Sequence, residues 1–182
     1  MTLLILGILL WYAGHFFKRV LPGLHDSLGP RAKGVSAVLI LAGLVLMVIG
    51  YRGTVTGFAY TPPSWGIHLN NLLMVLAVYL YAASGTKARL ATKMRHPQLT
   101  AVKTWAVAHL LVNGDWASVV LFGALLAWAV AEVIVINRSQ RDWTPPVWGG
   151  PSAEVKAVVG TAVVFAVIAG IHAWLGYWPF PG

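Results

Sequence analysis

Residues 95–131 read RHPQLTAVKTWAVAHLLVNGDWASVVLFGALLAWAVA. The stretch holds two apolar runs, residues 97–113 and 116–131, and the polar turn NGD stands between them. The second run contains no charged residue. A helix of about 20 apolar residues crosses the hydrocarbon core of a bilayer. The pattern therefore predicts two membrane helices that are joined by a tight turn.

The rest of the chain has the same character. Of its 182 residues, 58% are hydrophobic and only 10% are charged, and the mean hydropathy is +0.74. Soluble domains carry about one quarter charged residues. Further runs without a charge cover residues 1–17, 34–51, 53–86 and 157–182. The sequence therefore predicts an all-α, polytopic membrane protein with a single domain over residues 1–182.

Six membrane helices are expected, near residues 2–20, 34–51, 66–85, 97–113, 115–136 and 156–176. Tandem prolines in YTPPSW (60–65) and WTPPVWGGPS (143–152) predict loops, because proline removes a helix hydrogen bond. Pro97 suits the first turn of the fourth helix, directly after His96. A second possibility is that this fourth helix is short and that its turn lies inside the protein.

Basic residues are concentrated in the odd-numbered loops, which hold 11 of the 13 Lys and Arg residues: Lys18, Arg19, Arg31, Lys33, Lys87, Arg89, Lys93, Arg95, Arg138, Arg141 and Lys156. The positive-inside rule places these loops in the cytoplasm and both termini on the opposite side. The net charge of +8 would suggest nucleic-acid binding in a soluble protein. Here topology and anionic lipid explain it, so we expect the lipid bilayer and no nucleic acid as a partner. The absence of cysteine excludes thiolate ligands and covalent c-type haem.

Four of the six histidines lie within predicted helices, where ionisable groups are costly and usually functional. At about 1.5 Å per residue, His15 lies roughly 10 Å and His109 roughly 18 Å above the cytoplasmic boundary. Their separation in depth of about 8 Å would suit two imidazoles on opposite faces of a tilted haem. His172 and His68 come out nearer the outer surface, at roughly 24 and 27 Å.

Neighbours on each helix indicate packed sites. Trp11 precedes His15 by four residues, as Trp105 precedes His109, so each pair shares a helix face. Asn113 continues the second row, and His68 with Asn71 forms a similar pair on another helix. Two interpretations stay open: these groups hold a cofactor or handle protons, or they hydrogen-bond one helix to another.

The segment HPQLTAVKTWAVAHLLVNGDWASVVLFG (96–123) resembles the signature of the NnrU family, polytopic membrane proteins that are found beside denitrification genes in bacteria. The likeness extends to LHDSLGPRAKGVSAVLILAGL (24–44), WGIHLNNLLMVLAVYLYAAS (65–84) and GIHAWLGYWPFPG (170–182). The resemblance implies a multi-pass protein of the bacterial inner (cytoplasmic) membrane. It also implies a link to the expression or maturation of nitrite and nitric oxide reductases.

Plant relatives of this family are 15-cis-ζ-carotene isomerases, which bind b-type haem through histidines. The resemblance implies haem b in this chain, with the following candidate residues: His15 and His109 as iron ligands, Trp11 and Trp105 beside them, and His68 or His172 as substitutes. The plant motif has a cysteine three residues before the second histidine, whereas this chain has Ala106. A mechanism that exchanges histidine and thiolate ligands is therefore excluded. Cis–trans isomerisation of a carotenoid-type, hydrophobic small molecule stays an alternative, and whether the protein is an enzyme is open.

A third interpretation comes from RHP at residues 95–97. Membrane methyltransferases use an Arg-His-Pro-x-Tyr segment to hold S-adenosylmethionine, but Gln98 and Leu99 stand here where tyrosine is expected, and the downstream acidic pair is missing. We therefore expect Arg95 and His96 to anchor the helix at the cytoplasmic face. We expect Asn113 and Asp115 to close the turn, with Asp115 capping the next helix.

Overall fold

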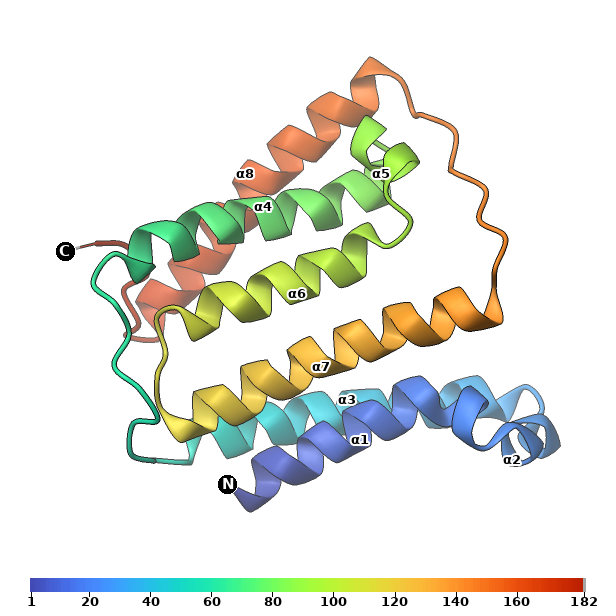
Figure 1. Ribbon diagram of the computed structural model, residues 1–182, viewed down its shortest axis with the longest axis horizontal. Helices are drawn as coiled ribbons and strands as arrows, with labels where there is room; N and C mark the ends of the chain where they lie inside the picture. Colours follow the sequence, from blue (N-terminus) through green and yellow to red (C-terminus); the bar gives the residue numbers. More distant parts are fainter. Residues whose placement is uncertain (182) are drawn as a thin grey trace. The chain divides into compact units, whose positions relative to one another are not determined.

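The computed structural model describes residues 1–181, and its secondary structure is helical apart from one isolated bridge between Phe58 and Asp115. The helices can be followed in Figure 1. Their bounds are α1 (Thr2–Val20), α2 (Pro22–Leu28), α3 (Arg31–Arg52), α4 (Gly66–Thr86), α5 (Arg89–Lys93), α6 (Pro97–Leu110), α7 (Trp116–Ser139) and α8 (Pro151–Trp174).

The predicted all-helical membrane fold is confirmed. Within residues 1–181, five helices are long and apolar enough to span a membrane, namely α1, α3, α4, α7 and α8. Helix α6 has 14 residues and is therefore about 21 Å long, shorter than a hydrocarbon core of about 30 Å. It ends three residues before the predicted 113, which agrees with the alternative of a short fourth helix. The count of six spans and the orientation of the termini stay predictions.

The helix ends differ from the sequence prediction where the loops contribute structure. Helix α8 begins at Pro151, five residues before the predicted start, because proline is tolerated in the first turn, where its missing N–H is not needed. The short helices α2 and α5 were not predicted, and both lie in the basic loops. The start of α6 is as predicted, with His96 at the N-cap and Pro97 in the first turn.

The chain divides into two compact units, Met1–Ala59 with Asp115–Ala124 and Tyr60–Gly114 with Leu125–Gly182. Helix α7 begins in the first unit and continues in the second. The expectation of a single domain stays a prediction, and each unit is described in turn.

In the first unit, α1 and α3 lie side by side and α2 joins them (Figure 1). Four glycines let the two backbones touch. A Cβ atom on Gly50 would lie 2.3 Å from the backbone nitrogen of Leu4, and one on Gly43 would lie 2.8 Å from that of Trp11. In lipid, helices associate largely through such close packing of small residues. The glycines lie seven residues apart on each helix, so that each pair shares a face: Gly7 and Gly14, and Gly43 and Gly50.

The first turn of α7 is fixed within the same unit by Asp115. Its Oδ1 accepts the backbone N–H of Ser118 at 3.0 Å, and its Oδ2 accepts the Ser118 hydroxyl at 2.5 Å. The Ser118 oxygen also lies 2.9 Å from the hydroxyl of Tyr51 on α3. Thr56 adds a hydroxyl 3.4 Å from Asp115 Oδ1 and accepts the N–H of Ala117 at 3.1 Å. The predicted capping of this helix by Asp115 is confirmed.

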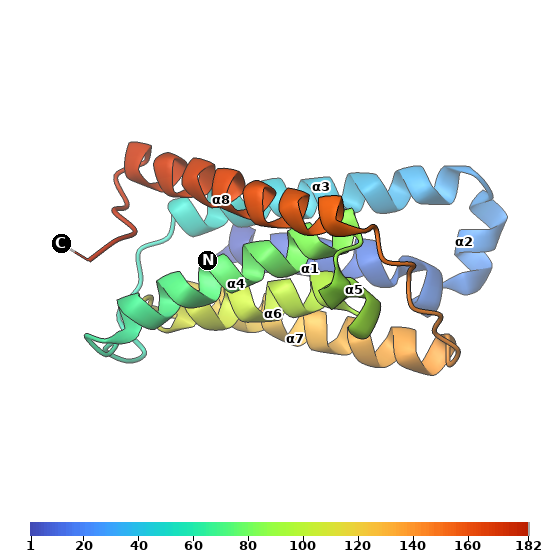
Figure 2. The same cartoon turned by 90° about the horizontal axis from the view of Figure 1, so that it is seen from above.

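In the second unit, α4 packs against both α6 and α8, and α5 lies at the end of α4 where α8 begins (Figure 2). Small residues allow this packing: Ala83, Ala88 and Ala157 are wholly buried, and Tyr79 and Leu90 pack against them. The beginning of α8 is therefore held close to the end of α4.

Glu154 fastens this end of the second unit. Its Oε1 accepts the backbone N–H of Arg89 at 2.7 Å and the indole N–H of Trp148 at 2.9 Å. The Arg89 guanidinium lies 4.5 Å from the centre of the Trp148 ring, which is a cation–π contact. The N–H of Gly149 donates to the carbonyl of Lys87 at 3.0 Å. One carboxylate thus connects α5, α8 and the loop before α8.

Candidate functional site

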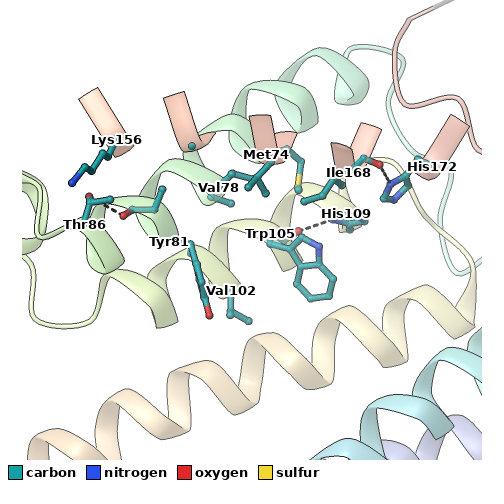
Figure 3. A pocket seen from close by; sticks show the side chains of 15 residues that line it. Met74, Val78, Tyr81, Thr86, Val102, Trp105, His109, Lys156, Ile168 and His172 are labelled. Carbon is teal, nitrogen blue, oxygen red and sulfur yellow. Dashed lines mark hydrogen bonds between the residues drawn. The ribbon is translucent and has the colours of Figure 1, made fainter. Parts of the chain in front are cut away.

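Helices α4, α6 and α8 of the second unit line a cavity of about 450 Å³, within the range of small-molecule sites. Its walls are mostly apolar, with Met74 and Val78 from α4 among them. Two histidines, His109 and His172, lie at one end, and Lys156 lies at the other (Figure 3). The cavity is therefore apolar along its length and polar at its ends.

His109 is held in a defined orientation on α6. Its Nδ1 lies 2.9 Å from the backbone carbonyl oxygen of Trp105, one turn earlier. A carbonyl oxygen only accepts hydrogen bonds, so Nδ1 carries the proton and the lone pair is on Nε2. The Trp105 ring lies beside the imidazole, with 5.0 Å between ring centroids. A held Nδ1–H with its lone pair on Nε2 is the form in which histidine commonly binds a metal.

His172 reaches the same end of the cavity from α8 (Figure 3). Its Nδ1 lies 2.8 Å from the backbone carbonyl oxygen of Ile168, so it has the same tautomer as His109. Two imidazoles from different helices are thus brought to one cavity. In the sequence analysis, His172 was predicted only as a substitute ligand.

His15 belongs to the first unit. Its Nδ1 lies 2.9 Å from the carbonyl oxygen of Trp11, and the two rings lie 4.4 Å apart. The predicted pairing of each histidine with a tryptophan on the same face is therefore confirmed for both His15 and His109. His68 is exposed on α4 and is not among the residues that line the cavity.

Arg95 and His96 fasten the beginning of α6 to the end of α7. The Arg95 guanidinium donates to the carbonyl oxygens of Gln140 and Arg141. His96 Nε2 lies 2.8 Å from Oδ1 of Asn137. Neither residue lines the cavity, so within the described residues they make protein contacts away from it.

Asn113 closes the other end of α6. Its side-chain amide donates to the backbone carbonyl oxygen of His109 at 2.9 Å, and its backbone carbonyl oxygen accepts a hydrogen bond of 3.0 Å from the hydroxyl of Tyr60. The hydrogen-bonding role expected for Asn113 is thus observed. Asn71 accepts a hydrogen bond of 3.3 Å from the buried amide of Asn70.

Sequence reasoning missed two features of the second unit. In the sequence, Lys156 served only as a basic loop residue that indicates topology. The structure shows that it lines the cavity, and no periodic pattern in the sequence indicates this position. The second feature is Glu132 of α7, of which only 5% is exposed. The sequence did contain a signal for this burial, because Glu132 follows a run of 16 residues without a charge. An ionisable group inside a membrane span usually faces the interior of the helix bundle and has a function.

The residues of the cavity fit a b-type haem in their chemistry. Such a haem needs one or two axial donors from the protein and apolar surroundings, and His109, His172 and the apolar walls supply both. In residues 1–181 no three His, Asp or Glu side chains are grouped as ligands of a bare metal ion.

Comparison with known proteins agrees with the motif in α6 and its turn. The sequence model of the family described as NnrU protein matches residues 3–179, which is nearly the whole chain. No curated protein and no solved structure matches the chain. Because the match covers the helices of both units, the chain belongs to the NnrU family.

Proposed function

We propose that this NnrU protein binds b-type haem in the membrane with His109 as an axial ligand. The observation that supports the proposal is the Nδ1 of His109, fixed on the Trp105 carbonyl at the end of an apolar cavity. The hydrogen bond sets both the tautomer and the ring orientation, so little ordering of the ligand is needed on binding. When bound, haem supplies a redox-active iron whose potential follows from its axial ligands and surroundings.

The second axial ligand is His15 or His172. The depth estimate and the family resemblance favour His15. The shared cavity favours His172. Both carry the Nδ1 proton against the carbonyl four residues earlier, so their ligand chemistry is the same. Apolar residues line the cavity next to His109, and the Trp105 ring lies beside the imidazole with 5.0 Å between ring centroids.

The biological setting that we propose is the expression or maturation of nitrite and nitric oxide reductases, which the family resemblance implies. Two alternatives have less support. Carotenoid-type isomerisation has no thiolate, because buried Ala106 occupies the position of the plant cysteine. S-adenosylmethionine binding would need Arg95 and His96, which make hydrogen bonds to Gln140, Arg141 and Asn137 instead.

An absorption spectrum of the protein, purified in detergent from haem-replete cells, tests the proposal. We expect a low-spin Soret band that shifts on reduction with dithionite. His109→Ala should lose haem or become high-spin, and whichever of His15→Ala and His172→Ala does the same identifies the second ligand. His25→Ala is the control, because His25 lies in α2 and pairs with Asp26 at 3.2 Å. Protein that stays colourless after haem reconstitution, or an unchanged spectrum of His109→Ala, would overturn the proposal.

A further inference from the structure

The end of the cavity opposite the histidines has a chemistry of its own. Lys156 lines it from α8, is exposed, and has no ion-pair partner within residues 1–181. The neighbouring acid, Glu154, is bound to Arg89 and Trp148 instead. The hydroxyl of Thr86, which also lines this end, donates to the carbonyl of Ala82 at 3.0 Å. A single ammonium group therefore stands at the mouth of an apolar cavity.

The cavity is long compared with one leaflet of a bilayer. Lys156 and His172 are 16 residues apart on α8, which corresponds to about 24 Å along the helix. One leaflet contributes about 15 Å of hydrocarbon, half of a core of about 30 Å. A chain that begins at Lys156 and extends through one leaflet therefore ends near residue 166, between Val164 and Ile168 of the cavity wall and less than two turns before His172. The histidine end is left to the site proposed above.

The walls between these points suit a hydrocarbon chain. Val78 and Ala82 of α4, Ala101 and Val102 of α6, and Gly160 of α8 present only apolar atoms from their side chains or no side chain at all. Gly160 leaves open space, because a Cβ atom placed there would meet no atom within 4 Å. Apolar surface of this kind is covered by lipid in a membrane protein.

We propose that this half of the cavity binds one acyl chain of an anionic phospholipid, whose phosphate pairs with Lys156. A cation near the membrane surface attracts anionic lipid by about 1 kcal/mol, which corresponds to about five-fold in affinity. Lys87 and Arg89, at the same end of the second unit, add to the positive potential there. The bilayer itself supplies the ligand.

Photolabelling in lipid nanodiscs tests the proposal. The probe is a phosphatidylglycerol with a diazirine at the end of one acyl chain, and labelled peptides are located by mass spectrometry. We expect labels on α8 near Val164 and on α4 near Val78. Lys156→Gln should lower this labelling about five-fold. Lys156→Arg should retain it, and so should Lys33→Gln, which removes the same charge from the first unit.

A second pair of variants tests the chain independently of the headgroup. Gly160→Leu adds bulk to the cavity wall at a position where a Cβ atom meets no atom within 4 Å, and it should abolish labelling near Val164. Gly170→Leu is the matched control, since Gly170 is also on α8 and in open space but does not line the cavity. Haem-free and haem-reconstituted protein should give the same labelling, which separates this site from haem binding. Equal labelling by a phosphatidylcholine probe, stronger labelling by a fatty-acid probe, or unchanged labelling in Lys156→Gln or Gly160→Leu would overturn the proposal.

Discussion

Replacing Asp115 by alanine should destabilise the protein at the beginning of α7. Three hydrogen bonds end on this carboxylate: the N–H and the hydroxyl of Ser118, and the hydroxyl of Thr56. Ser118 is wholly buried, so its hydroxyl cannot turn to water, although it keeps its contact with Tyr51. The change therefore removes a helix cap and weakens a buried hydrogen-bond network at the same time.

The size of the effect follows from these contacts. Loss of an N-cap side chain costs about 0.5–2 kcal/mol, and loss of a further hydrogen bond costs about 1 kcal/mol. We therefore expect the free energy of unfolding to fall by about 1.5–3 kcal/mol. For a protein of this size that corresponds to a decrease in Tm of roughly 3–12 °C. Asp115→Asn should give a smaller decrease, because Oδ1 still accepts the N–H of Ser118.

The effect should depend on pH in a defined direction. Burial raises the pKa of Asp115, but the hydrogen bonds from the Ser118 hydroxyl and from backbone N–H groups outweigh it and hold the pKa below its ordinary value of 3.8. A lowered pKa in the folded state adds stability above the ordinary value, and this stability is lost as the pH falls through the folded pKa. The Tm difference between wild type and Asp115→Ala should therefore be full at pH 7 and shrink below about pH 4.

Thermal unfolding in detergent, followed by circular dichroism, measures these differences. Asp26→Ala is the matched control, because the Asp26 side chain is 77% exposed and its partner His25 is its neighbour in sequence. We expect that control to unfold within about 1 °C of wild type at pH 7. If Asp115→Ala unfolds at the same temperature as the control, the capping argument is wrong.

Gly50→Leu should lower the free energy of unfolding by about 1–3 kcal/mol or more, because α1 and α3 must separate to make room for the side chain. Gly34→Leu, on the open face of α3, should not lower it. Equal thermal stability of the two variants would refute the close packing. Glu154→Ala should speed tryptic cleavage after Arg141, because it releases Arg89 and Trp148, while Asp26→Ala in the first unit should leave that cleavage rate unchanged. A cytoplasm-active reporter fused at the C-terminus should be silent and one in loop 140–150 active, as the positive-inside rule requires; the reverse pattern would overturn the topology.

The helices of this protein could be predicted from its sequence because charged residues and prolines separate the apolar runs. The start of α6 at Pro97 and the first five predicted helices agree with the structure to within a few residues. The exceptions have physical reasons. Proline breaks a helix only from its interior, so the run that begins at Pro151 was placed too late. The basic loops have no long apolar run, so the short helices α2 and α5 gave no periodic signal.

Contacts between helices could likewise be predicted only in part from the sequence. The glycine spacing on α1 and α3 was visible in the sequence, but only the structure shows that Gly50 meets Leu4 and that Gly43 meets Trp11. The cavity of the second unit depends on which faces of α4, α6 and α8 meet. All three are apolar around much of their circumference, as helices in lipid are, and such helices give no preferred inward face. Lys156 therefore could not be assigned to a site from its position in the chain.

The tautomer of the candidate ligands is a local property, whereas their pairing is not. His15, His109 and His172 each place Nδ1 on the carbonyl four residues earlier, at 2.9, 2.9 and 2.8 Å. That carbonyl is always one turn back on the same face of a helix, and lipid offers no competing acceptor. A histidine inside any membrane helix can therefore adopt this form, and the form alone does not mark a cofactor site. What distinguishes His109 and His172 is that separate helices bring them to one cavity, so the spectra of the three histidine variants test tertiary structure and not helix chemistry.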